Sequence, residues 1–211
     1  MTTTTTHALA RRGIRLSTAA ATLSLVAALG GCSDDMAGMP GMGSSASPAA
    51  SSSATAAFNN ADVTFVQMMI PHHEQAVGMS NMLLAKSGVD PDVQALAQQI
   101  KAAQGPEITL MTGWLTAWGQ PTASGEMGGM HHGGDDGVMT PGQMEALDGA
   151  DGATGQRLYL EGMIEHHKGA VTMARDELDN GQNPDAVKLA QAITDSQTAE
   201  ITTMEDLLAG L

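Results

Sequence analysis

Cysteine is almost missing from this chain of 211 residues, since Cys32 is the only one. An internal disulfide is therefore excluded. Aromatic residues are also scarce, at 2% of the sequence, although apolar residues as a whole make up 42%. Runs of β-branched and aromatic residues that favour a sheet are thus missing. The composition predicts an all-α protein whose helices pack closely on Ala, Leu, Ile, Val and Met.

Basic residues are few as well. The chain has 9 Lys and Arg against 23 Asp and Glu, a formal net charge of −14. Binding to nucleic acid needs basic patches, so we expect no nucleic-acid partner. A strongly negative domain attracts cations, although a merely solubilising surface explains most of these carboxylates equally well.

The N-terminus has the pattern of a targeting segment. Three arginines (Arg11, Arg12 and Arg15) precede an apolar stretch over 16–29, and "LGGC" follows, ending at Cys32. A stretch of about fourteen apolar residues is short for a bilayer span. We interpret residues 1–31 as a lipoprotein signal peptide and Cys32 as its lipidated residue. The protein would then be anchored to the outer face of the cytoplasmic membrane or lie in the periplasm; an ordinary secretory signal or an uncleaved anchor helix are the alternatives.

A Gly-, Ser- and Pro-rich stretch over 32–60 follows and is typical of a flexible tether. It contains Met36, Met39 and Met42 at intervals of three. These methionines could capture a soft metal, or the tract could be a linker that happens to contain methionine.

Residues 61–211 read as four helical segments. Their expected bounds are about 62–86, with Asp62 as the N-cap, then 91–118, 152–179 and 184–208, with a short turn over 140–147. Gly105-Pro106 predicts a kink in the second segment. The Gly-rich stretch at about 120–150 is expected to be an exposed, mobile crossover. The pattern predicts a four-helix bundle made of two helical hairpins.

The two hairpins repeat each other. "MIPHHEQAVGM" at 69–79 returns as "MIEHHKGAVTM" at 163–173, an offset of 94 residues. The following helices align at an offset of 93, so that Gln104, Glu107 and Met111 match Gln197, Glu200 and Met204. Such a repeat predicts two copies of one supersecondary unit that bury their apolar faces against each other.

The repeated motif has the composition of a metal site. At about 100° per residue, its Met and His side chains share about a third of a helix circumference, with a small Ala between them. Thioether and imidazole together favour Cu(I), and also allow Ag(I) or Cu(II). Di-iron bundles use Glu-x-x-His, whereas Met replaces that Glu in both copies here. The predicted copper ligands are Met69, His72, His73, Met79, Met163, His166, His167 and Met173. The alternative is that Met fills the core and His is structural.

Two further groups belong to this hypothesis. Glu107 and Glu200 can accept a proton from the outer nitrogen of a ligating histidine, or can form salt bridges at the bundle end. A cluster in the crossover can collect copper as an auxiliary group, or can be an idle polar loop; its members are Met127, Met130, His131, His132 and Met139.

The sequences "FVQMMIPHHEQAVGM" and "YLEGMIEHHKGAVTM", each followed by a helix carrying "Q..EI..M", resemble domain-of-unknown-function family 305. The resemblance covers about residues 60–209. It implies a ferritin-like bundle outside the cytoplasm that binds copper and supports copper tolerance, with the Met/His motif as its ligands.

We therefore expect a copper-binding lipoprotein that sequesters or transfers copper, with copper ions, the membrane through Cys32, and a copper donor or acceptor protein as partners. No catalytic constellation is identified, so we do not expect an enzyme. A ferritin-like metal-dependent oxidase and a structural or partner-binding helical domain are the alternatives.

Overall fold

The computed structural model describes residues 56–122 and 136–211. All regular structure in these two ranges is helical, which confirms the predicted all-α, ferritin-like bundle. Its elements are α1 (Asn60–Leu84), α2 (Pro91–Ala117), α3 (Pro141–Gly149), α4 (Gly152–Asn180) and α5 (Pro184–Gly210). The signal peptide, Cys32 and the linker methionines lie outside the described residues. Within the described ranges, no helix has the length and apolar character of a membrane span.

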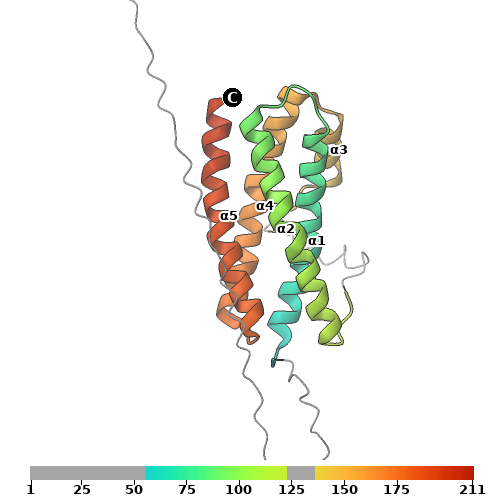
Figure 1. Ribbon diagram of the computed structural model, residues 1–211, viewed down its shortest axis with the longest axis vertical. Coiled ribbons are helices and arrows are strands. Elements are labelled where there is room, and N and C mark those ends of the chain that lie inside the picture. Colours follow the sequence, from blue (N-terminus) through green and yellow to red (C-terminus); the bar gives the residue numbers. More distant parts are fainter. Residues whose placement is uncertain (1–55, 123–135) are drawn as a thin grey trace, which may run out of the picture. The chain divides into compact units, whose positions relative to one another are not determined.

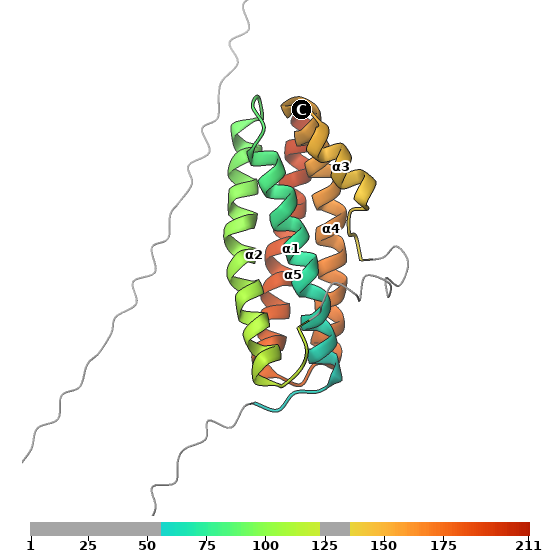
Figure 2. The same ribbon diagram turned by 90° about the vertical axis from the view of Figure 1, so that its right-hand side faces the viewer.

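The four long helices form two antiparallel hairpins, α1–α2 and α4–α5 (Figure 1). Helix α1 packs on α4, and this contact joins the hairpins. Helix α3 lies across the α1–α4 pair, as Figure 2 shows from the side. The predicted turn before the third long helix is thus a helix of its own, with Thr140 and Gln143 forming a capping box at its start.

Local signals explain where the helices begin. Asn59, rather than the expected Asp62, is the N-cap of α1. Asp62 instead completes a capping box as the third residue of the helix, because its carboxylate accepts from the Asn59 backbone N–H. Proline opens α2 and α5, each directly after a capping Asp90 or Asn183.

Two prolines lie inside helices without ending them. Pro71 is within α1 and Pro106 is within α2, and both helices continue on either side. Each proline removes one helical hydrogen bond. Helix α2 continues through Gly105 and Pro106 without a break. The kink expected at this point stays a prediction.

The apolar core has two parts. The first, named the Tyr159 cluster, contains the second half of α1 and the first half of α4, including Ala76, Met79, Tyr159, Leu160 and Met163. The second, named the Phe65 cluster, contains the opposite halves, including Phe65, Met69, Met111, Ala170 and Ala174. Because α1 and α4 are antiparallel, the four histidines of the repeated motif occupy the level between the two clusters.

Candidate metal centre

His72 of α1 and His166 of α4 meet where the two helices cross. Their ring centroids are 3.6 Å apart, with an interplanar angle of 38°. Both side chains are buried. The structure thus brings together the first histidine of each repeated motif, although they are 94 residues apart in the chain.

Burial decides the charge of these two rings. It is the largest influence on His72: burial, together with the neighbouring His73 and His167, outweighs the hydrogen bond with the Asp136 carbonyl and lowers the pKa of that ring to about 3. Burial, followed by the proximity of His72, also holds the pKa of His166 well below its usual value. Both imidazoles are therefore neutral at physiological pH, which is the form that binds a metal ion.

The second histidine of each motif is held by a carboxylate. His73 Nε2 lies 2.8 Å from Glu107 Oε2, and His167 Nε2 lies 2.8 Å from Glu200 Oε2. Each Nε2–H donates to the carboxylate, so Nδ1 is the ring nitrogen that this contact leaves unengaged. The structure places Glu107 and Glu200 beside the histidines as the sequence predicts; their service to a metal ion remains a prediction.

Several ring nitrogens of the site are buried without a hydrogen-bond partner. They are the Nδ1 atoms of all four histidines and also Nε2 of His166. Buried polar atoms in folded proteins almost always have a partner. Lone pairs that are buried, neutral and unpaired are what a metal ion would use, so the donor set fits a metal.

The methionines of the motif lie on both sides of the histidines. Met79 and Met163 belong to the Tyr159 cluster, whereas Met69 and Met173 belong to the Phe65 cluster. Three of these side chains are fully buried and Met173 is partly buried. The antiparallel packing therefore places one thioether from each hairpin on either side of the histidine pair.

Oxygen and nitrogen ligands alone do not form a site here. Within 56–122 and 136–211, no three His, Cys, Asp or Glu side chains are grouped so as to hold a metal ion. The other donor atoms at this level are the thioether sulfurs of the motif methionines. Such a mixed donor set selects soft metals over iron, manganese or magnesium.

The crossover was expected to be exposed, but Met139 within it is buried. Gln75 of α1 binds both the N–H and the carbonyl of Met139, at 2.8 and 2.9 Å. The carbonyl of Asp136 accepts a hydrogen bond from His72 Nε2, at 2.9 Å. Met127, Met130, His131 and His132 lie outside the described residues.

Sequence reasoning did not assign the contacts of this segment or the two glutamines of the site. Gln104 and Gln197 are equivalent, nearly fully buried, and have unpaired amide atoms. In the sequence, the repeated "Q..EI..M" pattern is the feature that indicates these two glutamines. The signal for the crossover contact is the loss of bulk on α4, where Gly162 and Gly169 stand in the places that Met68 and Gln75 have on α1.

The fold and the site define a helical bundle of two repeated Met/His hairpins. The chain belongs to the family described as domain of unknown function DUF305, whose profile matches residues 62–208. No curated protein matches the chain.

Solved structures show the same fold. A DUF305 fragment from Deinococcus radiodurans is 32% identical, with a TM-score of 0.66, over 72% of this chain and 98% of its own. A DUF305 protein from Streptomyces coelicolor, provisionally described as secreted, is 36% identical, with a TM-score of 0.65, over 71% and 93%. CopM in its Cu(I)-bound form is 31% identical, with a TM-score of 0.59, over 71% and 96%. CopM is also known in Cu(II)-bound and Ag-bound forms.

Proposed function

We propose that this protein binds copper as Cu(I) between its two hairpins, outside the cytoplasm, and thereby sequesters or transfers it. The observation that carries this proposal is the buried pair of His72 and His166, whose unpaired nitrogens lie between two sets of thioethers. Neutral imidazole and thioether are ligands that Cu(I) accepts, and Ag(I) shares this preference.

The structures of CopM support the choice of metal. That protein shares about a third of its residues with this chain and is known with Cu(I), Cu(II) and Ag. Exchange between thioethers would let the ion move to an acceptor protein without protonation or deprotonation of a ligand, because a thioether is neutral with and without the ion. The surplus of carboxylates would raise the local concentration of cations.

A titration of the purified protein with Cu(I), in competition with a chromogenic Cu(I) chelator, tests the proposal. We expect the protein to withdraw Cu(I) from the chelator, and we expect His72→Ala combined with His166→Ala to remove this binding. X-ray absorption should show both sulfur and nitrogen around copper. The proposal is wrong if the double variant, still folded by circular dichroism, binds as many ions as tightly as the parent.

The site of action is part of the same proposal. We infer that the chain is exported and that Cys32 carries lipid, on the grounds of the arginine-led apolar stretch and "LGGC". Expression of Cys32→Ala in a bacterial host, followed by membrane fractionation, tests the anchor. The parent should sediment with membranes and the variant should not; equal sedimentation would contradict lipidation at Cys32.

A further inference from the structure

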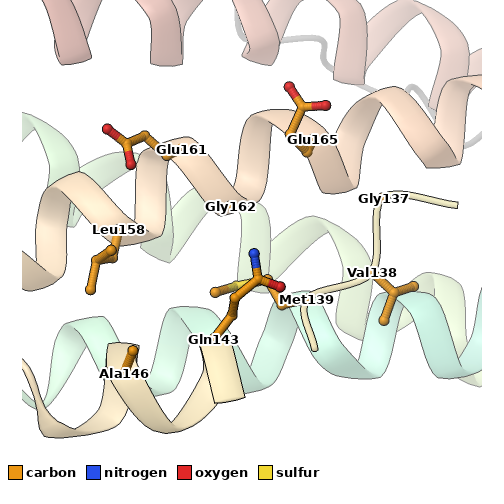
Figure 3. Close-up of a pocket in the computed structure, with 9 residues that line it drawn as sticks. All are labelled: Gly137, Val138, Met139, Gln143, Ala146, Leu158, Glu161, Gly162 and Glu165. Carbon is orange, nitrogen blue, oxygen red and sulfur yellow. The ribbon is translucent and has the colours of Figure 1, made fainter. Parts of the chain in front are cut away.

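The end of the crossover, Asp136–Met139, lies along α4 as an ordered strap. Gly137 has φ of +69° and lies directly against the Glu165 carbonyl, where a side chain would collide. Gly169 likewise leaves no room for a side chain, because the Asp136 carbonyl occupies that space. Figure 3 shows the strap turning from Gly137, beside α4, to Met139. The strap therefore follows the helix at backbone contact.

Hydrogen bonds from side chains of α1 hold the strap in one position. The Gln75 amide makes two hydrogen bonds with the backbone of Met139, and His72 donates to the carbonyl of Asp136. These three bonds come from side chains that lie in the α1–α4 contact. The strap is thus tied to the same pair of helices that carries the histidines.

These contacts place the Met139 side chain against α4 at Gly162. A Cβ atom built on Gly162 would lie only 2.7 Å from Met139 Sδ, so the sulfur occupies the space of a side chain at that position. Gly162 precedes His166 by one helical turn. Side chains on a helix lean toward its N-terminus, so the His166 ring is directed over this turn.

His166 has fewer hydrogen bonds than the other three histidines of the site. Neither of its ring nitrogens has a hydrogen-bond partner, whereas the other three rings each have one nitrogen engaged. Met139 belongs to the Tyr159 cluster, together with Met79 and Met163. It also lines a surface groove of about 430 Å³ with Gly162, so its sulfur lies between this groove and the core.

The internal repeat shows how the two helices differ at this position. Gly162 aligns with Met68, which precedes His72 by one turn on α1 and is 41% exposed. The second hairpin lacks a methionine at this position, and the strap places the buried sulfur of Met139 there.

We propose that Met139 is a thioether ligand for a soft monovalent cation, Cu(I) or Ag(I), held at His166. The strap supplies a thioether at the position where α4 has Gly162. The bound ion in turn holds the strap against α4. This inference rests on the proposed function, because it assumes that the histidine pair binds such an ion.

The test compares Met139→Leu with Met144→Leu. Leucine keeps the apolar volume but removes the sulfur, and Met144 packs against the same cluster from α3. We expect Met139→Leu to weaken Cu(I) binding by about tenfold or more, since loss of a ligand should cost at least as much as loss of a group that orients one. The Cu(I) affinity of Met144→Leu should match the parent, and X-ray absorption should lose sulfur only in Met139→Leu. Equal affinity and equal sulfur count in both variants would overturn the proposal.

A transplant of the thioether excludes a purely structural role. Met139→Ala should weaken binding, and adding Gly162→Met should restore it, because α4 itself then supplies a sulfur one turn before His166. Persistent weak binding in a folded double variant would count against the proposal. If the parent protein binds Cu(I) and needs His166 while Met139→Leu has no effect, only this inference fails; if no variant, including the histidine double variant, differs from the parent, the proposed function fails.

Discussion

The immediate surroundings of each histidine determine the charge of its ring or the orientation of its ring. Burial keeps His72 and His166 neutral, and carboxylates fix the orientation of His73 and His167. The carboxylates that hold His73 and His167 lie outside the repeated motif, on α2 and α5. Groups of this kind orient a ligand and raise its basicity.

At the residue scale we predict that Glu107→Leu lowers the Cu(I) affinity about 10- to 100-fold, whereas Glu107→Gln keeps most of it. The Gln side-chain oxygen can still accept from His73 Nε2–H, and Leu cannot. A competition titration measures both. Glu165→Gln is the control, because its ion pair with Lys168 is exposed and worth little. Identical affinities for the Leu and Gln variants would refute an orienting role of Glu107.

At the scale of the helix, two glycines inside the long helices differ in what they contact. Gly78, inside α1, has nothing within 4 Å of its missing Cβ. Gly169, inside α4, faces the Asp136 carbonyl. Gly78 lowers the stability of the helix without a packing reason, whereas Gly169 makes room for the strap.

We therefore expect opposite signs from two identical changes. Gly78→Ala should stabilise the protein by about 0.5–1 kcal/mol, the helix-interior penalty of glycine. Gly169→Ala should destabilise it by about 1–3 kcal/mol, the usual cost of overpacking, and should displace the strap. Urea unfolding of the copper-free variants measures both. A stabilising effect of Gly169→Ala would mean that the strap does not pack at this point.

A buried acid pair joins the start of α1 to the end of α4. Burial, reinforced by the adjacent Asp62, raises the pKa of Glu177 to about 8. Burial also acts to raise the pKa of Asp62, but hydrogen bonds from the backbone of Asn59 and Asn183, and from Glu177 and Gln182, outweigh it and lower the pKa. At neutral pH Glu177 is thus protonated and Asp62 is ionised.

This pair predicts a pH dependence. Because the pKa of Glu177 is raised in the folded state, its contribution to stability is fully present below pH 4.5 and is lost as the pH rises to about 8. Glu177→Gln cannot ionise, so the unfolding free energy of the parent should fall relative to this variant across that window. Taking the difference at each pH cancels the buried histidines, which change stability in the opposite direction. Parallel curves for the two copper-free proteins would contradict the assignment.

The whole molecule has an approximate twofold relation between its hairpins. Asp62 on α1 accepts backbone N–H groups of Gln182 and Asn183, in the turn before α5. Its counterpart on α4, Gln156, accepts the backbone N–H of Asp90, the cap of α2. Each hairpin thus holds the turn of the other, so the hairpins are joined at both ends as well as at the histidines.

Binding of an ion by both hairpins should therefore stabilise the whole fold. At free Cu(I) of about 100 times Kd, the gain is about 2.7 kcal/mol, visible as a higher Tm in a thermal melt under reducing conditions. Ca²⁺ should cause no shift, since it prefers oxygen ligands. His72→Ala with His166→Ala should remove the Cu(I) shift; a shift that survives in this variant would place the ion elsewhere.

The repeat and its spacing determined the helices, their pairing into two hairpins and the stripe that carries Met and His. These features depend on local periodicity and capping, which neighbouring residues set. Tertiary structure alone decided three contacts: His72 lies against His166, Met69 shares a cluster with Met173 rather than with its equivalent Met163, and Met139 occupies the space beside Gly162. Such contacts join segments far apart in the chain, and they depend on the direction and separation of packed helices, which the spacing of residues along one helix does not specify.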